Sequence, residues 1–168
     1  MPKITFNALV EDYSSQVLNT ATRILGDAQK AQDVHQEVFL AIWRRWNTYN
    51  GQVNWRGYLY RTTVRKAIEI AIQEKNQMIL KYKHQQFTNN DNAEPAAGVI
   101  TAELREKLAG CLAKLPQRQA DVFVLSRMEG FTSQTIAEIL DCSNETVRVH
   151  LHRAVKRLAV ELGDYLNK

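Results

Sequence analysis

The sequence predicts an all-α protein of two small helical domains joined by a flexible linker, the C-terminal domain containing a helix-turn-helix. Apolar residues recur at helical spacing through most of the 168 residues. Almost no segment shows the two-residue alternation of a half-buried strand. One stretch rich in Asn, Asp and Ala, at residues 88–98, interrupts the helical pattern. We therefore expect domains at 1–87 and 100–168, with the linker at 88–99.

The N-terminal domain is predicted to contain three helices. Apolar residues follow helical spacing over residues 6–25, and Gly26-Asp27 can end this helix and begin the next. The second helix carries its apolar stripe to Trp46. Residues 47–52 contain Asn and Gly, which tolerate left-handed backbone angles, and they predict a loop. A third, long helix is expected from about residue 54 towards residue 83.

The C-terminal domain is predicted to begin with two further helices. Helical periodicity resumes at Leu104 and stops at Pro116. Because proline has no backbone N–H to leave unpaired, Pro116 can sit in the first turn of the following helix. Gly130 is expected to end that helix.

Two capping signals then frame a helix-turn-helix. Thr132 can accept hydrogen bonds from the free N–H groups of a short helix, and Ser143 can do so for a second helix after the turn at 141–143. The residues of the second helix that should face a core are Val147, Leu151, Ala154 (or Val155) and Leu158. Its other face is basic, with no acid over 146–160, and carries Arg148, His152, Arg153, Lys156 and Arg157. In helix-turn-helix proteins a helix of this kind lies in the major groove of DNA, and we predict that role here. The alternative interpretation of this segment is two ordinary surface helices.

A second basic segment, residues 38–68, contains no acidic residue. Its cations are Arg44, Arg45, Arg56, Arg61, Arg65 and Lys66, and its aromatic residues are Phe39, Trp43, Trp46, Tyr49, Trp55, Tyr58 and Tyr60. Cations among aromatic rings suit single-stranded nucleic acid, because guanidinium groups follow phosphates and unstacked bases find flat faces. The adjacent Asn/Gly loop could receive a flipped base. The alternative is that the rings fill the core of a small domain and the cations form a solvated face.

Composition narrows the functional classes. A formal charge of +4 permits a nucleic-acid partner without demanding one. The two cysteines are far apart in the sequence and do not suit a metal site. His150 and His152, which are two residues apart on a helix, do not suit one either. The sequence shows no Gly-rich phosphate loop, nucleophile elbow or paired-carboxylate signature, so we expect no cofactor, no metal and no enzyme. We see no signal peptide or membrane-spanning run, and expect a cytoplasmic protein without membrane insertion.

Taken together, the order and spacing of these residues resemble a bacterial RNA polymerase sigma factor of the extracytoplasmic-function type, in the sigma-70 family. The resemblance covers residues 6–162. Its marks in the N-terminal half are residues 31–40, Trp43 and the aromatic stretch 55–61. Its marks in the C-terminal half are Leu115-Pro116, Val122-Phe123, Leu125, Ile136-Ala137, Thr146-Val147-Arg148 and Arg153-Ala154.

The resemblance implies a region-2-like domain that binds the β′ clamp of core RNA polymerase and the −10 element, and a region-4-like domain that binds the β flap and the −35 element. The residues implied in polymerase binding are Asp33, Gln36, Glu37, Phe39, Leu40 and Trp43. Those implied at the −10 DNA are Asn50, Asn54, Trp55, Tyr58, Arg61 and Arg65. Those implied at the −35 DNA are Ser143, Asn144, Glu145, Thr146, Arg148, His152, Arg153 and Lys156. The family is commonly held by an anti-sigma factor, although nothing in the sequence identifies one.

The chain departs from the family pattern at the end of the −10 helix. Where the family often has Asn, Asp and Arg, this chain has Arg65, Glu69 and Ile72, and the usual Glu before the Ile-Ala pair is Thr135. Two other functions therefore stay open. One is a helix-turn-helix regulator that acts without joining polymerase. The other is an accessory protein that docks on polymerase but does not open DNA.

Overall fold

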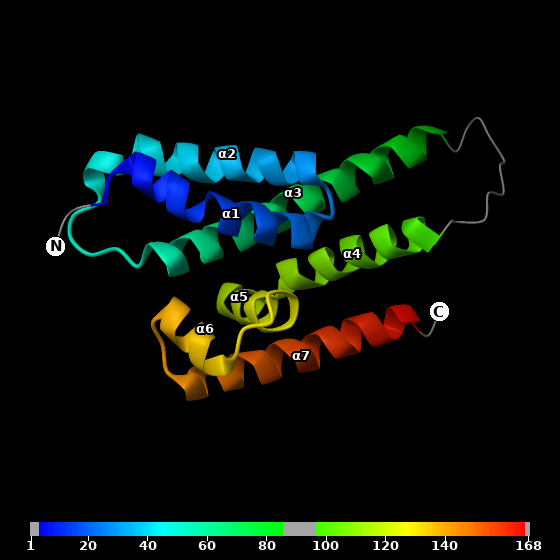
Figure 1. Cartoon of the computed structure of the whole chain (residues 1–168). Coiled ribbons are helices and arrows are strands. Elements are labelled where there is room, and N and C mark those ends of the chain that lie inside the picture. Colours follow the sequence, from blue (N-terminus) through cyan, green and yellow to red (C-terminus); the bar gives the residue numbers. More distant parts are fainter. Residues whose placement is uncertain (1–3, 86–96, 167–168) are drawn as a thin grey trace.

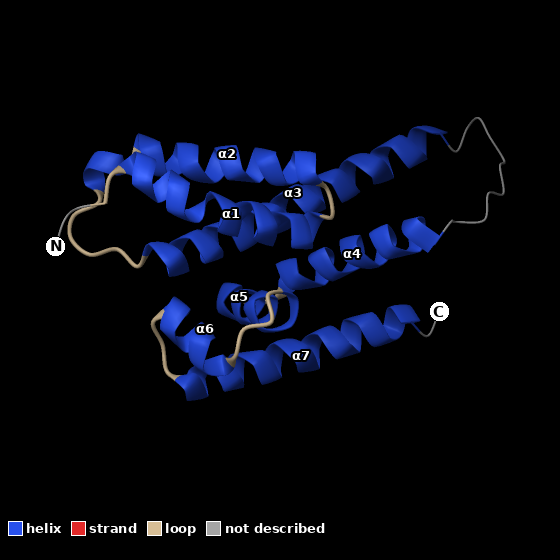
Figure 2. Cartoon of the chain, viewed as in Figure 1, coloured by secondary structure: helices blue, strands red, loops and turns tan. Residues whose placement is uncertain are grey.

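The computed structural model describes residues 4–85 and 97–166, and every regular element in these ranges is a helix (Figure 2). The elements are α1 (Phe6–Leu25), α2 (Ala28–Arg44), a 3-10 turn η1 (Trp46–Thr48), α3 (Trp55–Gln85), α4 (Ala97–Lys114), α5 (Gln117–Phe123), a π-helical segment η2 (Val124–Met128), α6 (Ser133–Leu140) and α7 (Asn144–Leu166). The all-α prediction is confirmed. Among the described residues, no helix combines the length and the apolar character that crossing a membrane requires.

Local caps fix the boundary between the first two helices. Gly26 takes a left-handed conformation, with φ of 67°, and its N–H donates to the Thr22 carbonyl to close α1. The Asp27 carboxylate then accepts the N–H groups of Gln29 and Lys30 at 2.8 and 3.1 Å. These bonds satisfy backbone donors that α2 leaves free at its start. The helix break predicted at Gly26-Asp27 is confirmed.

The first three helices form the N-terminal half, in which α1 contacts α2 and α3 (Figure 1). The helix α3 is 31 residues long, and its C-terminal part lies along α4. The large buried side chains of this half include Leu9, Val17, Val34, Val38, Ile42, Leu59 and Val64. Residues 86–96, which hold most of the predicted linker, lie outside the described residues. The helix α4 begins at Ala97 and so takes in the last three linker positions.

Two breaks separate the helices that follow α4. Pro116 has an extended ψ of 141°, which a continuing helix does not allow, so the helical run of α4 stops before it. Pro116 itself lies directly before α5. The sequence predicts one regular helix from there to Gly130, whereas η2 widens the last turns, with the Glu129 N–H donating to the Val124 carbonyl at 3.0 Å. Gly130 then takes a φ of 77°, which ends the helical run as predicted.

The helix-turn-helix is formed by α6 and α7. The Thr132 hydroxyl accepts the Thr135 N–H at 3.2 Å, and the Ser143 hydroxyl accepts the Thr146 N–H at 3.0 Å, so both predicted caps are present. Asp141, with φ of 53°, makes the left-handed turn between the helices. The face of α7 that is buried consists of Val147, Ala154 and Leu158, with Leu151 half-buried and Val155 exposed.

The two halves of the chain pack against each other. One buried cluster combines Leu9 and Leu59 from the first half with Leu112 and Val124 from the second. A second cluster places Tyr60 among the apolar residues of the helix-turn-helix, Val122, Leu125, Ile136, Ala137, Ile139, Leu140 and Val147. The helix α3 contacts α4, α5 and α6, and Figure 1 shows its first part on the side of the N-terminal half that faces α5 and α6.

Candidate nucleic-acid interface

The basic face of α7 is open to solvent. Of the residues predicted at the −35 DNA, those with exposed side chains are Ser143, Asn144, Glu145, Arg148, His152, Arg153 and Lys156. Thr146 is half-buried, and its hydroxyl lies 2.7 Å from that of Ser143 within the cap. Beside Arg148, His152 and Lys156 the surface is hollowed by about 350 Å³. The cationic side chains are therefore free to meet phosphates and base edges while the opposite face of the helix is held in the core.

The two histidines of α7 point to different surroundings. His152 is exposed, whereas His150 is half-buried with its Nδ1 enclosed and unpartnered. Burial, and then the charges of Arg118 and Arg153, lower the pKa of His150. Within the described residues, no three His, Cys, Asp or Glu side chains come close enough to hold a metal ion.

An aromatic cluster, Trp46, Tyr49, Trp55 and Tyr58, lies where the loop meets α3. The Trp46 and Trp55 rings stack with centroids 5.5 Å apart, and Tyr49 meets Trp55 edge-on at 5.1 Å. The hydroxyls of Tyr49 and Tyr58 lie 3.0 Å apart, and burial followed by this hydrogen bond raises the pKa of Tyr49 to about 12. All four rings are half-buried. They pack on one another as the core alternative expects, and each keeps part of its surface exposed.

The aromatic cluster opens onto a hollow beside the loop. Trp46, Tyr49 and Trp55 line this hollow of about 280 Å³ together with the exposed loop residues Asn50 and Gly51. The aromatic and loop residues predicted at the −10 DNA are thus brought to one place. The hollow offers aromatic walls and a polar rim, which is what an unstacked base requires.

The other residues predicted at the −10 DNA lie elsewhere on α3 or are engaged. Asn54 donates from its side-chain amide to the Ile139 carbonyl at 2.8 Å and accepts the Gly57 N–H at 3.1 Å. Arg61 is half-buried and Arg65 is exposed, and both interact electrostatically with Asp121 on α5. These side chains face the C-terminal half of the same chain.

The residues predicted at the polymerase lie mostly on the outer face of α2. Asp33, Gln36 and Glu37 are exposed, as are Leu40 and Trp43, whose exposed fractions are 46% and 57%. Phe39 differs, because it is only 5% exposed. Its ring lies in the core against Phe6 and His35. Phe39 therefore supports the exposed face of α2 from within.

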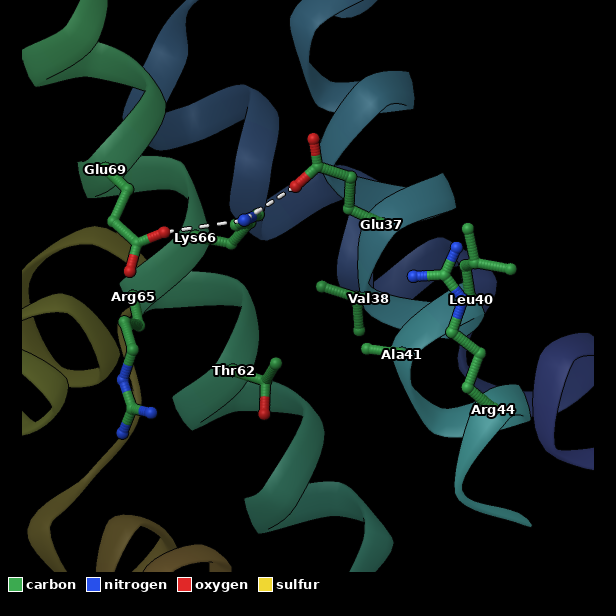
Figure 3. Close-up of a pocket in the computed structure, with 9 residues that line it drawn as sticks. All are labelled: Glu37, Val38, Leu40, Ala41, Arg44, Thr62, Arg65, Lys66 and Glu69. Carbon is green, nitrogen blue, oxygen red and sulfur yellow. Dashed lines mark hydrogen bonds and ion pairs between the residues drawn. The ribbon is translucent and has the colours of Figure 1, made fainter.

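A hollow of about 380 Å³ separates this face of α2 from α3 (Figure 3). An ion-pair network lies at one end of it: Lys66 on α3 lies 2.7 Å from Glu37 on α2 and 3.5 Å from Glu69. The hydrogen bond to Glu37 is the main reason that the pKa of Lys66 is raised. Arg44 and Arg65 line the same hollow from opposite helices. The face of α2 that was predicted at the polymerase and the helix α3 are thus joined by an ion pair.

Sequence analysis did not single out Asp121, which is 1% exposed. Burial raises the pKa of this carboxyl to about 6, against the hydrogen bond from Gln117 at 2.8 Å and the charges of Arg61, Arg65 and Arg118. Its second oxygen, Oδ2, has no hydrogen-bond partner. One acid in a helical pattern reads as a solvated residue, so no local signal could have identified it.

Comparison with known proteins matches both halves of the chain to regions of one family. The family model described as Sigma-70 region 2 matches residues 9–75, and the one described as Sigma-70, region 4 matches residues 105–158. The RNA polymerase sigma-H factor of Pseudomonas aeruginosa is 26% identical over 167 residues, which cover 90% of this chain and 83% of that protein. The ECF RNA polymerase sigma-E factor of Haemophilus influenzae is 28% identical over 160 residues, covering 90% of this chain and 84% of its own length.

Among solved structures, the sigma factor RpoE in complex with the anti-sigma factor NepR from Bartonella quintana aligns with 18% identity and a TM-score of 0.47, over 94% of this chain and 96% of that one. The matches to region 2 and region 4 come in the order that the sequence predicts. The chain belongs to the sigma-70 family, as a sigma factor of the extracytoplasmic-function type.

We expect Asp121 to make stability depend on pH. Its pKa is about 6 in the folded chain and about 4 in the unfolded one, so ionisation opposes folding. As the pH rises from about 4 to about 6, the free energy of unfolding should fall by about 3 kcal/mol. Above that range, the ionisation of Asp121 should change it little further. Asp121→Asn should remove this loss and raise the urea midpoint at neutral pH. Equal pH profiles for the variant and the parent would show that Asp121 does not titrate there.

Proposed function

We propose that this protein binds core RNA polymerase in the cytoplasm and directs it to promoters, with separate surfaces for polymerase, opened strand and duplex. The observation that carries the proposal is the pairing, in one chain, of a helix, α7, whose exposed face is basic and free of acids over residues 146–160, with an aromatic-lined hollow beside α3. The first suits intact double helix and the second suits an unstacked base. The family membership of both halves supports this division.

The proposed polymerase surface is the exposed face of α2. Positions 33, 36, 37, 40 and 43 recur every three or four residues, so their side chains share one face of the helix. The acids Asp33 and Glu37 stand beside the apolar side chains of Leu40 and Trp43. A partner helix with basic and apolar residues would complement this surface. We assign it to the clamp of the β′ subunit.

The proposed −10 surface begins at the aromatic cluster. A base turned out of the opening duplex would enter the hollow between the loop and the rings of Trp46 and Trp55. Arg61 and Arg65, further along α3, would follow the phosphates of the same strand. Stacking contributes roughly 1–3 kcal/mol per base in such surfaces, which is enough to favour the separated strand.

The proposed −35 surface is the exposed face of α7. Arg148, His152 and Lys156 are spaced by four residues, so they form one row along the helix. Asn144 and Glu145, at the helix N-terminus, would lie nearest the base edges in the major groove. The remaining part of this half would meet the flap of the β subunit.

A second candidate is an accessory protein that docks on polymerase without opening DNA. Glu69 favours it, because this acid stands on the −10 helix and lies 3.5 Å from Lys66. A carboxylate there repels a phosphate backbone and neutralises a nearby cation. The strand-opening experiment below separates the two candidates.

For polymerase binding we expect Glu37→Arg to weaken association with core polymerase by about tenfold or more, a change of about 1.4 kcal/mol. The substitution reverses a charge in the centre of the proposed face. The Lys66 pair that it removes is partly exposed, so stability should change by less than about 1 kcal/mol. Co-elution on size exclusion measures the effect, and Glu11→Arg, the same charge change on α1, is the control. Equal co-elution of both variants with polymerase would contradict the assignment.

For the −35 surface we expect Arg148→Ala to weaken binding to promoter duplex by about 1–3 kcal/mol. If the guanidinium lies on a phosphate rather than a base, the salt slope should fall by about one. Fluorescence anisotropy with holoenzyme over a range of salt concentrations measures both quantities. Lys81→Ala, which removes an exposed cation from α3, should leave them unchanged. An unchanged affinity and slope for Arg148→Ala would mean that α7 does not enter the groove.

For the −10 surface we expect Trp55→Ala combined with Tyr58→Ala to spare polymerase binding and reduce strand opening. The two changes remove stacking faces from the hollow, each worth roughly 1–3 kcal/mol. Permanganate reactivity of promoter thymines in the holoenzyme complex measures opening. Tyr82→Ala, an exposed aromatic far along α3, is the control. Equal opening by the parent and the double variant would contradict the assignment of these rings to the opened strand. If neither protein opens the promoter, the accessory-protein function is the better account.

A further inference from the structure

The last turns of α3 carry large apolar side chains that the rest of the chain leaves exposed. Figure 1 shows this end of α3, and the facing end of α4, extending past α1 and α2. The side chains are Met78, Ile79, Leu80 and Tyr82, and their exposed fractions lie between 44% and 62%. Leu104 on α4 is exposed beside them. Large apolar side chains gathered at one place on a surface mark a contact with another molecule.

A hollow of about 480 Å³, which we call the α3–α4 hollow, lies between these parts of the two helices. Met78 and Tyr82, four residues apart, share one face of α3 with Ile79 and form an apolar wall. Glu103 and Glu106 line the opposite wall, on α4. An occupant that fits both walls must therefore bring apolar side chains together with cations.

The charges around the α3–α4 hollow are divided between its two helices. The end of α3 carries the exposed cations Lys81 and Lys83, whereas α4 carries Glu103, which is exposed, and Glu106, which is half-buried. Among the described residues, no salt bridge involves any of these four side chains. Both signs of charge therefore remain available to a partner.

This division makes the surface complementary to itself. A two-fold axis can place α3 of one copy against α4 of another, so that the lysines of each copy face the glutamates of the other and the apolar walls meet. A nucleic acid or an anionic membrane would suit the lysines alone, because the glutamates in the same hollow repel phosphates and anionic lipids. The surface thus favours a protein partner that carries both signs, as a second copy does.

We propose that a second copy of this chain occupies the α3–α4 hollow and forms a two-fold symmetric dimer through the end of α3 and the facing part of α4. The dimer is a property of the chain free of polymerase. It does not rest on the proposed function, because the outer face of α2 and the basic face of α7 contribute none of the residues that line the hollow.

The mass of the full-length chain in solution tests the dimer. We expect sedimentation velocity to show this mass rising towards twice that of one chain as the concentration approaches about 100 µM, because small interfaces support micromolar association. Ile79→Asp should raise the dissociation constant of the dimer by about tenfold or more, since it places an unpaired charge in the apolar wall. Val160→Asp, the same kind of change at an exposed position of α7, is the control and should leave the constant unchanged.

A charge exchange provides a second, independent test. Glu103→Lys with Glu106→Lys should dissociate the dimer, because the new lysines face those of the partner copy. Lys81→Glu with Lys83→Glu should dissociate it as well. The chain that carries all four changes has opposite charges facing each other again, and it should dimerise like the parent. Circular dichroism should show equal helix content in all of these variants.

Each outcome decides the proposal. If the parent stays a monomer at about 100 µM, the dimer is overturned. If a dimer forms but survives both Ile79→Asp and the charge reversals, the assigned surface is overturned. If the parent is a monomer and Ile79→Asp weakens co-elution with core polymerase, the hollow belongs to that partner instead. The result for Glu37→Arg still decides the α2 surface by itself, because position 37 lies outside the α3–α4 hollow.

Discussion

The backbone of α6 lies against α3 at Gly57, a position without a side chain, and the arrangement of the two halves depends on this close approach. It brings the Ile139 carbonyl within reach of the Asn54 amide and lets Tyr60 enter the apolar cluster of the helix-turn-helix. Burying a large aromatic ring contributes about 1.5–3 kcal/mol. The contact therefore combines a backbone approach, a hydrogen bond and apolar burial in the first turns of one helix.

This contact determines which surfaces the chain presents. The outer faces of α2 and α7 lie away from it and remain exposed, so the proposed polymerase and duplex surfaces are available together. The side of α3 that carries Asn54 and Arg61 lies against the other half. The arrangement buries the carboxyl of Asp121 and leaves one of its oxygens without a hydrogen-bond partner, although arginines interact with it. This burial is unfavourable for folding. An acid retained at this cost is more easily explained by a role between the halves than by stability alone.

Much of the fold follows from local signals in the sequence. Thr132 and Ser143 accept N–H groups as predicted, and the predicted helix break at Gly26-Asp27 is present, because capping involves only the next two or three residues. Contacts between the halves leave no such signal. Tyr60 reads as part of a basic-aromatic surface and Phe39 as a docking residue, yet both are buried. Helical periodicity shows which face of each helix is apolar, but it does not show which other element that face contacts.

Asn54 shows how one side chain can take part in both folding and recognition. Its amide oxygen accepts the Gly57 N–H and so caps the start of α3, while its amide nitrogen donates to Ile139 across the contact. The two atoms have separate duties, because an asparagine amide has one acceptor end and one donor end. The amide nitrogen carries two hydrogens, so the bond to Ile139 uses only one of them. On the function that we propose, the N–H group that remains would suit a phosphate oxygen or a base carbonyl of the strand.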